Sequence, residues 1–384
     1  MKNNFFKSDW VLILIFSMLF IGDTLTALPL NTNFRFSLWA KALLSILFLI
    51  NLFFNKQKVL RFLLISAMML AIGMFFNFQN DILFKAAQYT EYYSGILFFA
   101  FIIVNKNEKL LLKILFFIFI IYAITILSAF IFELDYLKTY SGSSRFGYMP
   151  VFSSQNEFSF IMIAMIYFFY KRAILNKNWV NYFLFAFVFF TSLCIGTKVI
   201  YLFDLCFLAY LIYYHFGPKK LFYTFVLIGL FVVLFKKFWV DFLNSNFSVL
   251  MLVYKENGLI NALSSLRFEY LTKRLSCQIE NFNALNYFFG GTIEDCVVEM
   301  SFFDLFFFFG ILGLIIYSYL FKKIVINNLD LVIFSKLIFS FVLILSFLAG
   351  YYFENFSSQV YLLGVFYVYH KKMLDPDLEK GETI

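Results

Sequence analysis

Charged residues are scarce in this chain of 384 residues. They form 14% of the sequence, whereas 62% of residues are hydrophobic and the mean hydropathy is +0.84. Soluble domains carry charge on about a quarter of their residues, so this composition excludes a soluble globular protein. The sequence therefore predicts an all-α fold, in which residues 1–384 form one polytopic bundle of transmembrane helices.

Motifs of nucleotide and metal chemistry are also missing. The chain has no Gly-rich phosphate-binding loop, which argues against ATP as a substrate. Its four cysteines include no CxxC pair, so neither a metal site nor a cofactor is predicted. Cys277 and Cys296 share one polar segment and could pair in an oxidising compartment, although the sequence cannot show that they are close.

Long apolar runs recur along the chain, and each can cross about 30 Å of hydrocarbon as a helix. They predict about twelve transmembrane helices. The predicted spans are Val11–Leu28, Phe36–Phe54, Val59–Phe76, Tyr89–Val104, Leu110–Phe132, Phe158–Tyr170, Trp179–Ile195, Val199–Phe216, Leu221–Phe235, Ser301–Phe321, Leu331–Gly350 and Phe356–Tyr369.

Lysine and arginine occupy every second connection between these runs, from Lys2 and Lys7 at one end of the chain to Lys371 and Lys372 at the other. Short cytoplasmic loops are enriched in these residues, so both termini are predicted to be cytoplasmic, with residues 371–384 as a short tail. This topology also explains the net charge of +8. The expected partners of the cations are therefore membrane lipids and not nucleic acid.

Two connections on the opposite, non-cytoplasmic face are long. They comprise residues 133–157 and residues 236–300, whereas most other connections on that face are short. Long polar connections on one face only indicate that recognition or chemistry takes place outside the cytoplasm. Function is therefore expected in these two loops.

The first long loop contains a lone cation, Arg145, near the membrane. Its guanidinium could hold a pyrophosphate through two hydrogen bonds, or it could merely contact a lipid phosphate. The polar run from Ser153 to Asn156 follows at the start of the next helix, where a cap alone would need only one such group. Asn156 is therefore a further candidate for substrate binding.

The second long loop contains Arg267 and Arg274, which are seven residues apart and would share one face of a helix. Such a helix could simply lie on the membrane surface, or its basic face could hold an anionic, lipid-linked substrate. Glu299 and Asp304 flank the start of the next span, and Glu354 lies in the last outer loop. Each carboxylate is a candidate general base for a sugar hydroxyl or, alternatively, a water-exposed cap.

Charges inside the predicted spans are few, mainly Lys41, Asp204 and Lys336. An unpaired charge in hydrocarbon is costly, so Asp204 is expected to need a partner such as Lys198 or Lys41. A structural polar network and a substrate contact are both compatible with such a pair.

Four short motifs are spread over the chain. They are Arg-Phe-Gly at Arg145–Gly147, Ser-Ser-Gln-Asn-Glu at Ser153–Glu157, a CIGTK turn at Cys194–Lys198 and VEMSFFDLFFFFGILG at Val298–Gly313. Together with the large outer loop, they resemble the O-antigen polymerase (Wzy) family. That family belongs to a superfamily of integral membrane glycosyltransferases that also includes O-antigen ligases.

The resemblance implies that loop arginines hold an undecaprenyl-pyrophosphate-linked oligosaccharide, a role that would fall to Arg145, Arg267 and Arg274. Asn156 and Lys198, in the second and third motifs, would be further substrate contacts. The implied reaction is attack by a hydroxyl of one repeat unit on the anomeric carbon of a growing chain, with polyprenyl pyrophosphate leaving. The implied location is the bacterial inner membrane, and a chain-length regulator is an expected additional partner.

Glu299 aligns loosely with the position at which related ligases carry a histidine, and it is the predicted catalytic base. The two histidines of the chain, His215 and His370, are predicted to be cytoplasmic, which favours a polymerase over a ligase. A flippase or other transporter of lipid-linked oligosaccharides is the alternative, because such proteins also have about twelve helices. The long outer loop argues against a transporter. The polysaccharide could be O-antigen or a capsule.

Overall fold

The protein is described by a computed structural model, which defines residues 9–27, 36–75, 82–140, 146–152, 154–246, 248–264, 267–291, 296–298, 300–350 and 352–370. All regular elements in these residues are helices. An isolated bridge between Lys138 and Tyr148 is the one β pairing within them. The predicted all-α fold is confirmed.

Seven helices in the described ranges are long and apolar enough to cross a membrane, judged by length and composition alone. They are α1 (Asp9–Ala27), α2 (Phe36–Asn55), α3 (Gln57–Phe75), α5 (Glu108–Ile131), α6 (Gln155–Asn176), α8 (Lys198–Leu234) and α13 (Ser301–Leu320). Three shorter apolar helices are α7 (Trp179–Leu193), α14 (Ile333–Ala349) and α15 (Phe356–Val368). With α4 (Ile82–Asn105), these helices overlap all twelve predicted spans. The number of crossings and the orientation stay predictions.

Large apolar side chains are exposed on the helix surfaces. The exposed fraction is 77% for Trp10, 77% for Leu234 and 79% for Ile333. Extensive apolar exposure is unfavourable in water and is expected where a helix faces hydrocarbon. The packing therefore agrees with a membrane protein.

The chain divides into two compact units. The first contains the described parts of Met1–Ile121, Val151–Lys171 and Tyr270–Ile384, and the second those of Tyr122–Pro150 and Arg172–Glu269. Each unit is assembled from segments that are distant in the sequence, and each has its own internal packing.

Two helices form the centre of the first unit. Every residue of α15 is buried, and so is α6 over most of its length. A helix that is apolar around its whole circumference is expected to be surrounded by other helices. Gln359 in α15 accepts a hydrogen bond from the Gly95 amide at 3.1 Å and donates one to the Glu91 carbonyl at 3.0 Å. These bonds fix α15 against α4.

Three glycines let three backbones meet in the first unit, and we call this contact the glycine junction (Gly73, Gly290 and Gly310). α13 bends at Gly310, whose φ of 64° is left-handed, and a Cβ there would overlap the Gly290 amide nitrogen. A Cβ on Gly73 would likewise overlap the Gly290 carbonyl. Asn286 in α12 (Ala284–Phe289) donates to the carbonyl oxygens of Gly73 and Gly290, at 3.1 Å each. The helix predicted here is therefore bent.

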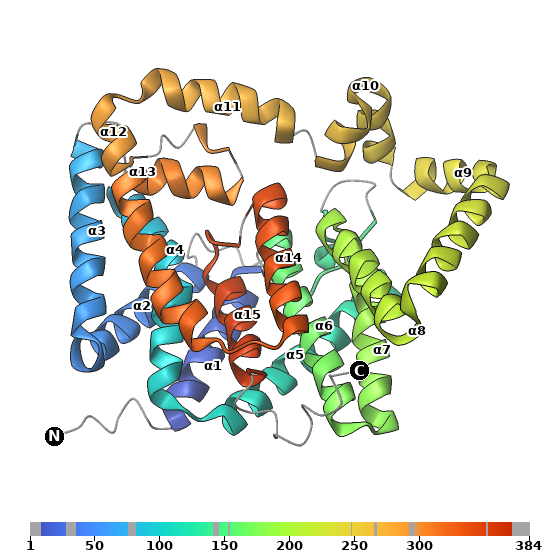
Figure 1. Ribbon diagram of the computed structural model, residues 1–384, viewed down its shortest axis with the longest axis horizontal. Coiled ribbons are helices and arrows are strands. Elements are labelled where there is room, and N and C mark those ends of the chain that lie inside the picture. Colours follow the sequence, from blue (N-terminus) through green and yellow to red (C-terminus); the bar gives the residue numbers. More distant parts are fainter. Residues whose placement is uncertain are drawn as a thin grey trace. The chain divides into compact units, whose positions relative to one another are not determined.

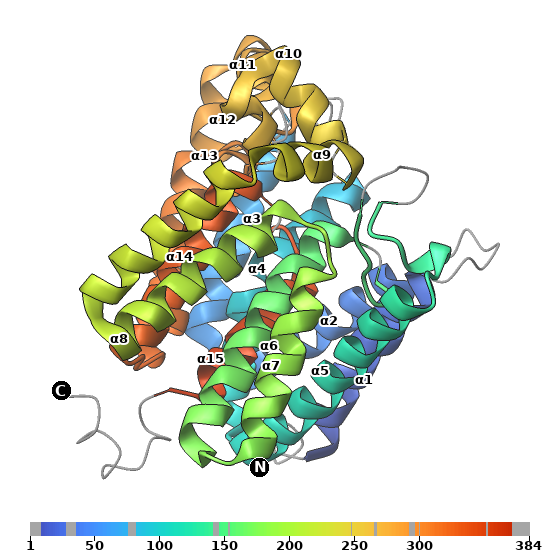
Figure 2. The same cartoon turned by 90° about the vertical axis from the view of Figure 1, so that its right-hand side faces the viewer.

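An amphipathic helix, α11 (Arg267–Asn281), lies over the first part of α13 (Figures 1 and 2). Leu271 and Leu275 pack on an apolar cluster that includes Met300 and Phe307. Burial of this apolar face stabilises α11 as a helix, since its opposite face is polar. The helix that Arg267 and Arg274 were expected to share is confirmed.

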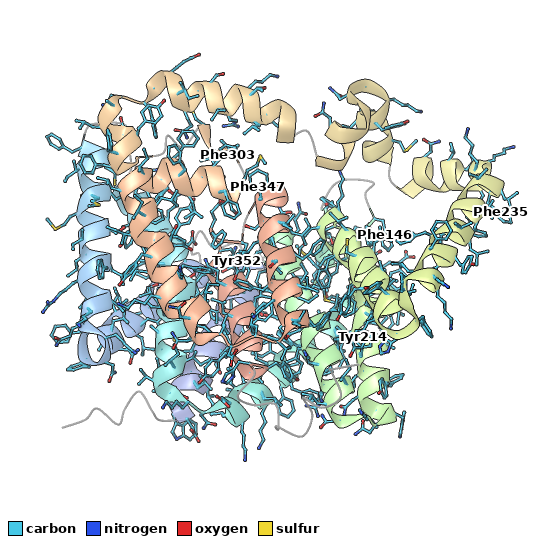
Figure 3. All side chains as sticks on the ribbon, in the orientation of Figure 1. Phe146, Tyr214, Phe235, Phe303, Phe347 and Tyr352 are labelled. Atoms are coloured by element: carbon cyan, nitrogen blue, oxygen red, sulfur yellow. A yellow bond between two sulfur atoms is a disulfide. The ribbon has the colours of Figure 1, made fainter. Side chains whose placement is uncertain are left out.

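A disulfide between Cys277 and Cys296 fastens α11 to the segment that leads into α13. The two Cα atoms are 5.7 Å apart, which is an ordinary separation for a disulfide. Sequence alone left this pairing open, and the structure shows it. Aromatic contacts add to the packing nearby, for example between the rings of Phe303 and Phe347, whose centroids are 6.0 Å apart (Figure 3).

The second unit contains α7, α8, α9 (Lys236–Asn246) and α10 (Ser248–Ser264). Gly217 has φ 80° and ψ 172° and precedes Pro218, so α8 consists of two helical arms that form a V (Figure 1). This bend lies where the sequence predicted a connection between two spans. The segment at 236–300, predicted as a loop, is a series of short helices over most of its described part.

Candidate functional site

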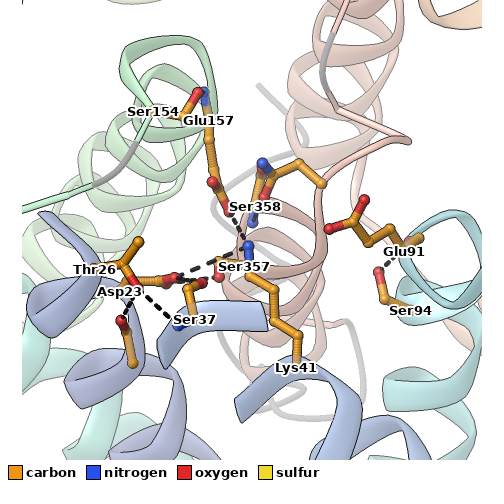
Figure 4. A network of polar contacts seen from close by, with 12 residues as sticks. Asp23, Thr26, Ser37, Lys41, Glu91, Ser94, Ser154, Glu157, Ser357 and Ser358 are labelled. Atoms are coloured by element: carbon orange, nitrogen blue, oxygen red, sulfur yellow. Dashed lines mark hydrogen bonds and ion pairs between the residues drawn. The ribbon is translucent and has the colours of Figure 1, made fainter. Parts of the chain in front are cut away.

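A lysine and two carboxylates meet inside the first unit, and we call them the Lys41 cluster (Asp23, Lys41 and Glu157). Lys41 Nζ in α2 lies 3.4 Å from Glu157 Oε1 in α6 and 3.9 Å from Asp23 Oδ1 in α1 (Figure 4). Both acidic residues are 1% exposed and Lys41 is 8% exposed. Three helices thus each bring one charge to the same point. Charged side chains inside a membrane are costly and usually functional, so the cluster is a candidate site.

Hydroxyl groups complete the hydrogen bonding of Asp23. Ser37 Oγ donates to Asp23 Oδ1 at 2.5 Å, and Ser357 Oγ donates to Asp23 Oδ2 at 2.7 Å. The Ser37 amide in turn donates to Thr26 Oγ1 at 2.7 Å. Asp23 therefore connects α1 to both α2 and α15, and its carboxylate is held from several sides.

The Lys41 cluster borders a cavity of about 320 Å³. Lys41 and Glu157 line this cavity together with Glu91 of α4 and Glu354, which precedes α15. Its volume falls in the range of small-molecule sites. The acidic lining suits a cation or a group rich in hydroxyls, and a carboxylate in such a place can accept a proton from a hydroxyl.

Asp304 also lines the cavity, but its carboxylate caps the start of α13. Its Oδ1 accepts a hydrogen bond from the Val298 amide and its Oδ2 accepts one from the Met300 amide, each at 2.8 Å. Backbone amides that precede a helix are commonly fixed by an acidic side chain in this way. Of the two roles considered for Asp304, the structure shows the cap, although the residue is buried and not water-exposed.

Two acidic residues of this site, Asp23 and Glu91, were not predicted from the sequence. The charges noted within the predicted spans were mainly Lys41, Asp204 and Lys336, although Asp23 and Glu91 also lie within such spans. The signal is present in the sequence, because an acidic residue inside an apolar run is rare. What the sequence does not contain is the pairing of residues from separate helices.

Asp204 in the second unit is hydrogen-bonded to a serine hydroxyl. Ser192 Oγ donates to Asp204 Oδ2 at 2.7 Å, and Asp204 is 3% exposed. Of the two partners considered for Asp204, Lys198 and Lys41, the second is paired with Asp23 and Glu157 instead, so that alternative is wrong. A hydroxyl at the end of α7 thus stabilises the carboxylate on α8.

Two of the sequence motifs meet in the second unit. The Tyr148 amide, directly after Arg-Phe-Gly, donates to the Cys194 carbonyl at 2.8 Å. A Cβ on Gly147 would overlap the Ile195 carbonyl, and a Cβ on Gly196 would overlap the backbone beside Gly147. Both glycines have positive φ angles, so no other residue fits there without strain. Close backbone contact accounts for the glycine of each motif.

The predicted basic and catalytic residues are only partly visible. Arg145 and Glu299 lie outside the described residues. The backbone of Arg267 begins α11, and its side chain is outside what the structure describes. Arg274 lies near the middle of α11 and is partly exposed. The role of these four residues stays a prediction.

The two remaining predicted contacts belong to different units. Asn156 is in the first turn of α6, beside Glu157, and is partly exposed. Lys198 is the first residue of α8, directly after the CIGTK turn, and belongs to the second unit. Asn156 therefore shares a unit with the acidic cavity, whereas Lys198 shares one with the paired motifs.

Comparison with known proteins gives no match. No protein-family model, no curated protein and no solved structure matches the chain. Within the described ranges, no group of three or more His, Cys, Asp and Glu side chains could hold a metal ion. The interpretation of the site therefore depends on its own geometry and on the motif resemblance.

Proposed function

We propose that this chain is a membrane glycosyltransferase that polymerises a surface polysaccharide by joining undecaprenyl-pyrophosphate-linked repeat units on the periplasmic face. The observation that carries the proposal is the cavity beside the Lys41 cluster, which Glu91, Glu157 and Glu354 line. A carboxylate in a cavity of an apolar bundle can take a proton from a sugar hydroxyl, which is a step that such a reaction needs. The motif resemblance supports the same reaction class.

The disulfide supports a periplasmic position for this cavity. Cys277 and Cys296 are joined near the start of α13, and Val297, the next residue, lines the cavity. Disulfides persist in oxidising compartments such as the bacterial periplasm. Lys56 and Lys58 lie at the far end of α2 and the start of α3, where the excess of lysine is typical of a cytoplasmic face.

In the proposed reaction, a sugar hydroxyl of one repeat unit attacks the anomeric carbon of a growing chain. The glycosidic bond forms as the bond from that carbon to the pyrophosphate oxygen breaks, and polyprenyl pyrophosphate leaves with the electron pair. Glu299 is the proposed base, and Glu91 and Glu354 are cavity carboxylates that could accept the proton in its place. Lys41 is a positioning residue, because it holds Glu157.

The leaving group carries negative charge that the protein has to neutralise. Arg145, Arg267 and Arg274 are the proposed ligands of the pyrophosphate, since guanidinium groups bind phosphate oxygens in pairs. Asn156 and Lys198 are proposed glycan contacts. The proposed location is the bacterial inner membrane, with a chain-length regulator as an additional partner and no cofactor.

A transporter of lipid-linked oligosaccharides is the second candidate. The Lys41 cluster favours it, because ion pairs buried within membrane-spanning helices often mark proton or ion pathways. An O-antigen ligase is a third possibility within the same superfamily. The three functions differ in the product that accumulates when the protein is absent.

The test is a gel of surface polysaccharide after deletion of the gene. Complementation would use wild type, Glu299→Gln, Arg274→Ala, Glu91→Gln and Glu354→Gln, with Lys336→Gln at an exposed position as the control. For a polymerase, deletion leaves lipid A core with a single repeat unit, and Arg274→Ala and the variant that lacks the base are expressed but do not restore the ladder. Glu299→Gln is expected to be that variant, and failure of Glu91→Gln or Glu354→Gln instead would identify that residue as the base. If the single unit is also absent, the block lies at export or ligation, and the transporter or ligase replaces the polymerase.

A further inference from the structure

A second cavity lies at the other end of the same helices. Its volume is about 450 Å³, and it is formed by the turn from α2 to α3, the end of α4 and the end of α13. Lys41 and Asn55, which line the two cavities, are both in α2 and lie about 21 Å apart at 1.5 Å per residue. The two cavities are therefore separate sites on opposite ends of the first unit.

The lining of this second cavity is basic and contains no acidic side chain. Lys56 and Lys58 contribute from the α2–α3 turn, and Lys323 contributes from the segment that follows α13. Three lysines therefore line one concave surface, which favours an anion.

The segment around Lys323 forms one wall of this cavity. After α13, the backbone forms a π turn at Phe321–Val325 and a 3₁₀ turn at Ile326–Asn328. Asn328 Nδ2 donates to the Lys323 carbonyl at 3.1 Å and to the Ile324 carbonyl at 2.9 Å, which fixes this turn. Two segments that are more than two hundred residues apart in the sequence thus enclose one space.

The partner of Lys323 is a neutral group. Its Nζ donates to the Tyr319 hydroxyl at 2.8 Å and lies 5.1 Å from the centre of the same ring. Phe62, which also lines the cavity, contacts the Tyr319 ring with a centroid distance of 5.3 Å. A hydroxyl orients the ammonium without cancelling its charge, so the cation remains able to bind an anion.

Apolar side chains form the rest of the wall. Phe54, Phe62 and Ile103 line the cavity, and Phe54 is 56% exposed at the helix surface. A free phosphate ion would contact only the lysines, whereas a phospholipid would also cover this apolar surface with its acyl chains. Basic pockets between membrane helices on the cytoplasmic side commonly bind anionic lipid headgroups.

We propose that this cavity, between the α2–α3 turn and the end of α13, binds the phosphate headgroup of an anionic phospholipid. Lys56, Lys58 and Lys323 contact the phosphate, and the acyl chains lie against the apolar wall beside Phe54. This site is independent of the proposed glycosyl transfer, because it lies at the opposite end of α2 from the acidic cavity. Lipid bound there joins α2 and α3 to the segment that follows α13.

The experiment is native mass spectrometry of the full chain, purified in detergent and titrated with phosphatidylglycerol, phosphatidylcholine or inorganic phosphate. The pocket variant is Lys56→Gln/Lys58→Gln/Lys323→Gln. The control variant is Lys109→Gln/Lys113→Gln/Lys322→Gln, which removes the same charge from exposed lysines that do not line the cavity. Gel filtration and a thermal melt establish that both variants are folded.

Each lysine near an anionic headgroup contributes about a factor of five, so the pocket variant should bind phosphatidylglycerol at least about tenfold more weakly. The control variant and the wild type should bind it equally, and phosphatidylcholine should bind weakly to all three. Displacement of the lipid by inorganic phosphate would support a phosphate site without a requirement for the lipid. Equal binding by the pocket and control variants, whether both lose the lipid or both keep it, would overturn the proposal.

Discussion

Two buried acidic sites show how differently this protein treats charge. In the first unit, Asp23 lies 3.9 Å from the Lys41 ammonium and accepts hydrogen bonds from Ser37 and Ser357. In the second unit, Asp204 accepts one hydrogen bond from Ser192 through Oδ2, and its Oδ1 has no hydrogen-bond partner among the described residues. One carboxylate has a counter-charge and several donors, whereas the other depends on a hydroxyl.

The difference separates two reasons for keeping an acidic residue inside a membrane protein. A carboxylate whose counter-charge comes from another helix holds those helices together, and loss of either partner leaves a buried charge alone. A carboxylate bound to one hydroxyl contributes little to helix association, because a neutral side chain could make the same bond. The Lys41 cluster should therefore be sensitive to substitution, and Asp204 should be tolerant.

Replacement of Lys41 by methionine is expected to have the largest effect. It would leave Asp23 and Glu157 buried without their cation, and breaking a buried pair in this way costs about 3 to 5 kcal/mol. Unfolding by SDS in mixed micelles, followed by tryptophan fluorescence, would measure the loss. Lys336→Met, at an exposed position of α14, is the control and should change stability by less than about 0.5 kcal/mol. Equal effects of the two substitutions would remove the special status of the cluster.

Loss of the disulfide is expected to have the next largest effect, and it disturbs the first unit by another route. Cys277→Ser/Cys296→Ser releases α11 from the segment that leads into α13. For a closed loop of this length the chain-entropy model gives about 3 kcal/mol, which a reducing agent should reproduce in the wild type. Cys206→Ser removes an exposed free thiol of the second unit and should leave the melting temperature unchanged. A wild-type melting temperature that does not respond to reduction would contradict this expectation.

Changes at Asp204 are expected to be the smallest. Ser192→Ala leaves the buried carboxylate without its hydroxyl donor and should cost about 1 to 3 kcal/mol. Asp204→Asn, in contrast, should be close to neutral, and the double substitution Ser192→Ala/Asp204→Asn should recover part of the loss. The same unfolding assay measures all three. A cost for Asp204→Asn as large as that for Lys41→Met would abolish the contrast between the two sites and point to a functional role for Asp204.

Helix positions could be predicted because they depend on local composition. Every predicted span overlaps a helix, and the break before Lys219 corresponds to the bend at Gly217 in α8. The bend at Gly310 was not predictable, since it arises from contact with the Gly290 backbone, which belongs to another segment. Apolar periodicity specifies that a helix forms but does not specify where a neighbouring backbone touches it.

Less of the candidate site could be predicted. Lys41 is conspicuous in the sequence as a charge within an apolar run. Its partner Glu157 is 116 residues away and is the last residue of a polar motif, so nothing in the sequence links the two. Ion pairs between helices depend on how the helices pack, and this packing cannot be inferred from a single sequence. Lys41 was therefore considered, beside Lys198, as a partner of Asp204, whereas its ion-pair partners in the structure come from α1 and α6.

The glycine junction also restricts the number of residues between its members. Because the backbones at Gly73, Gly290 and Gly310 touch without intervening side chains, a glycine has to occupy each of these three positions in space. A single residue inserted between Gly290 and Gly310 would shift one of them out of place and bring a side chain against a carbonyl. A substitution between the two glycines changes one side chain, whereas an insertion or deletion displaces a glycine from the contact. The protein should therefore tolerate substitutions in this stretch far better than insertions or deletions.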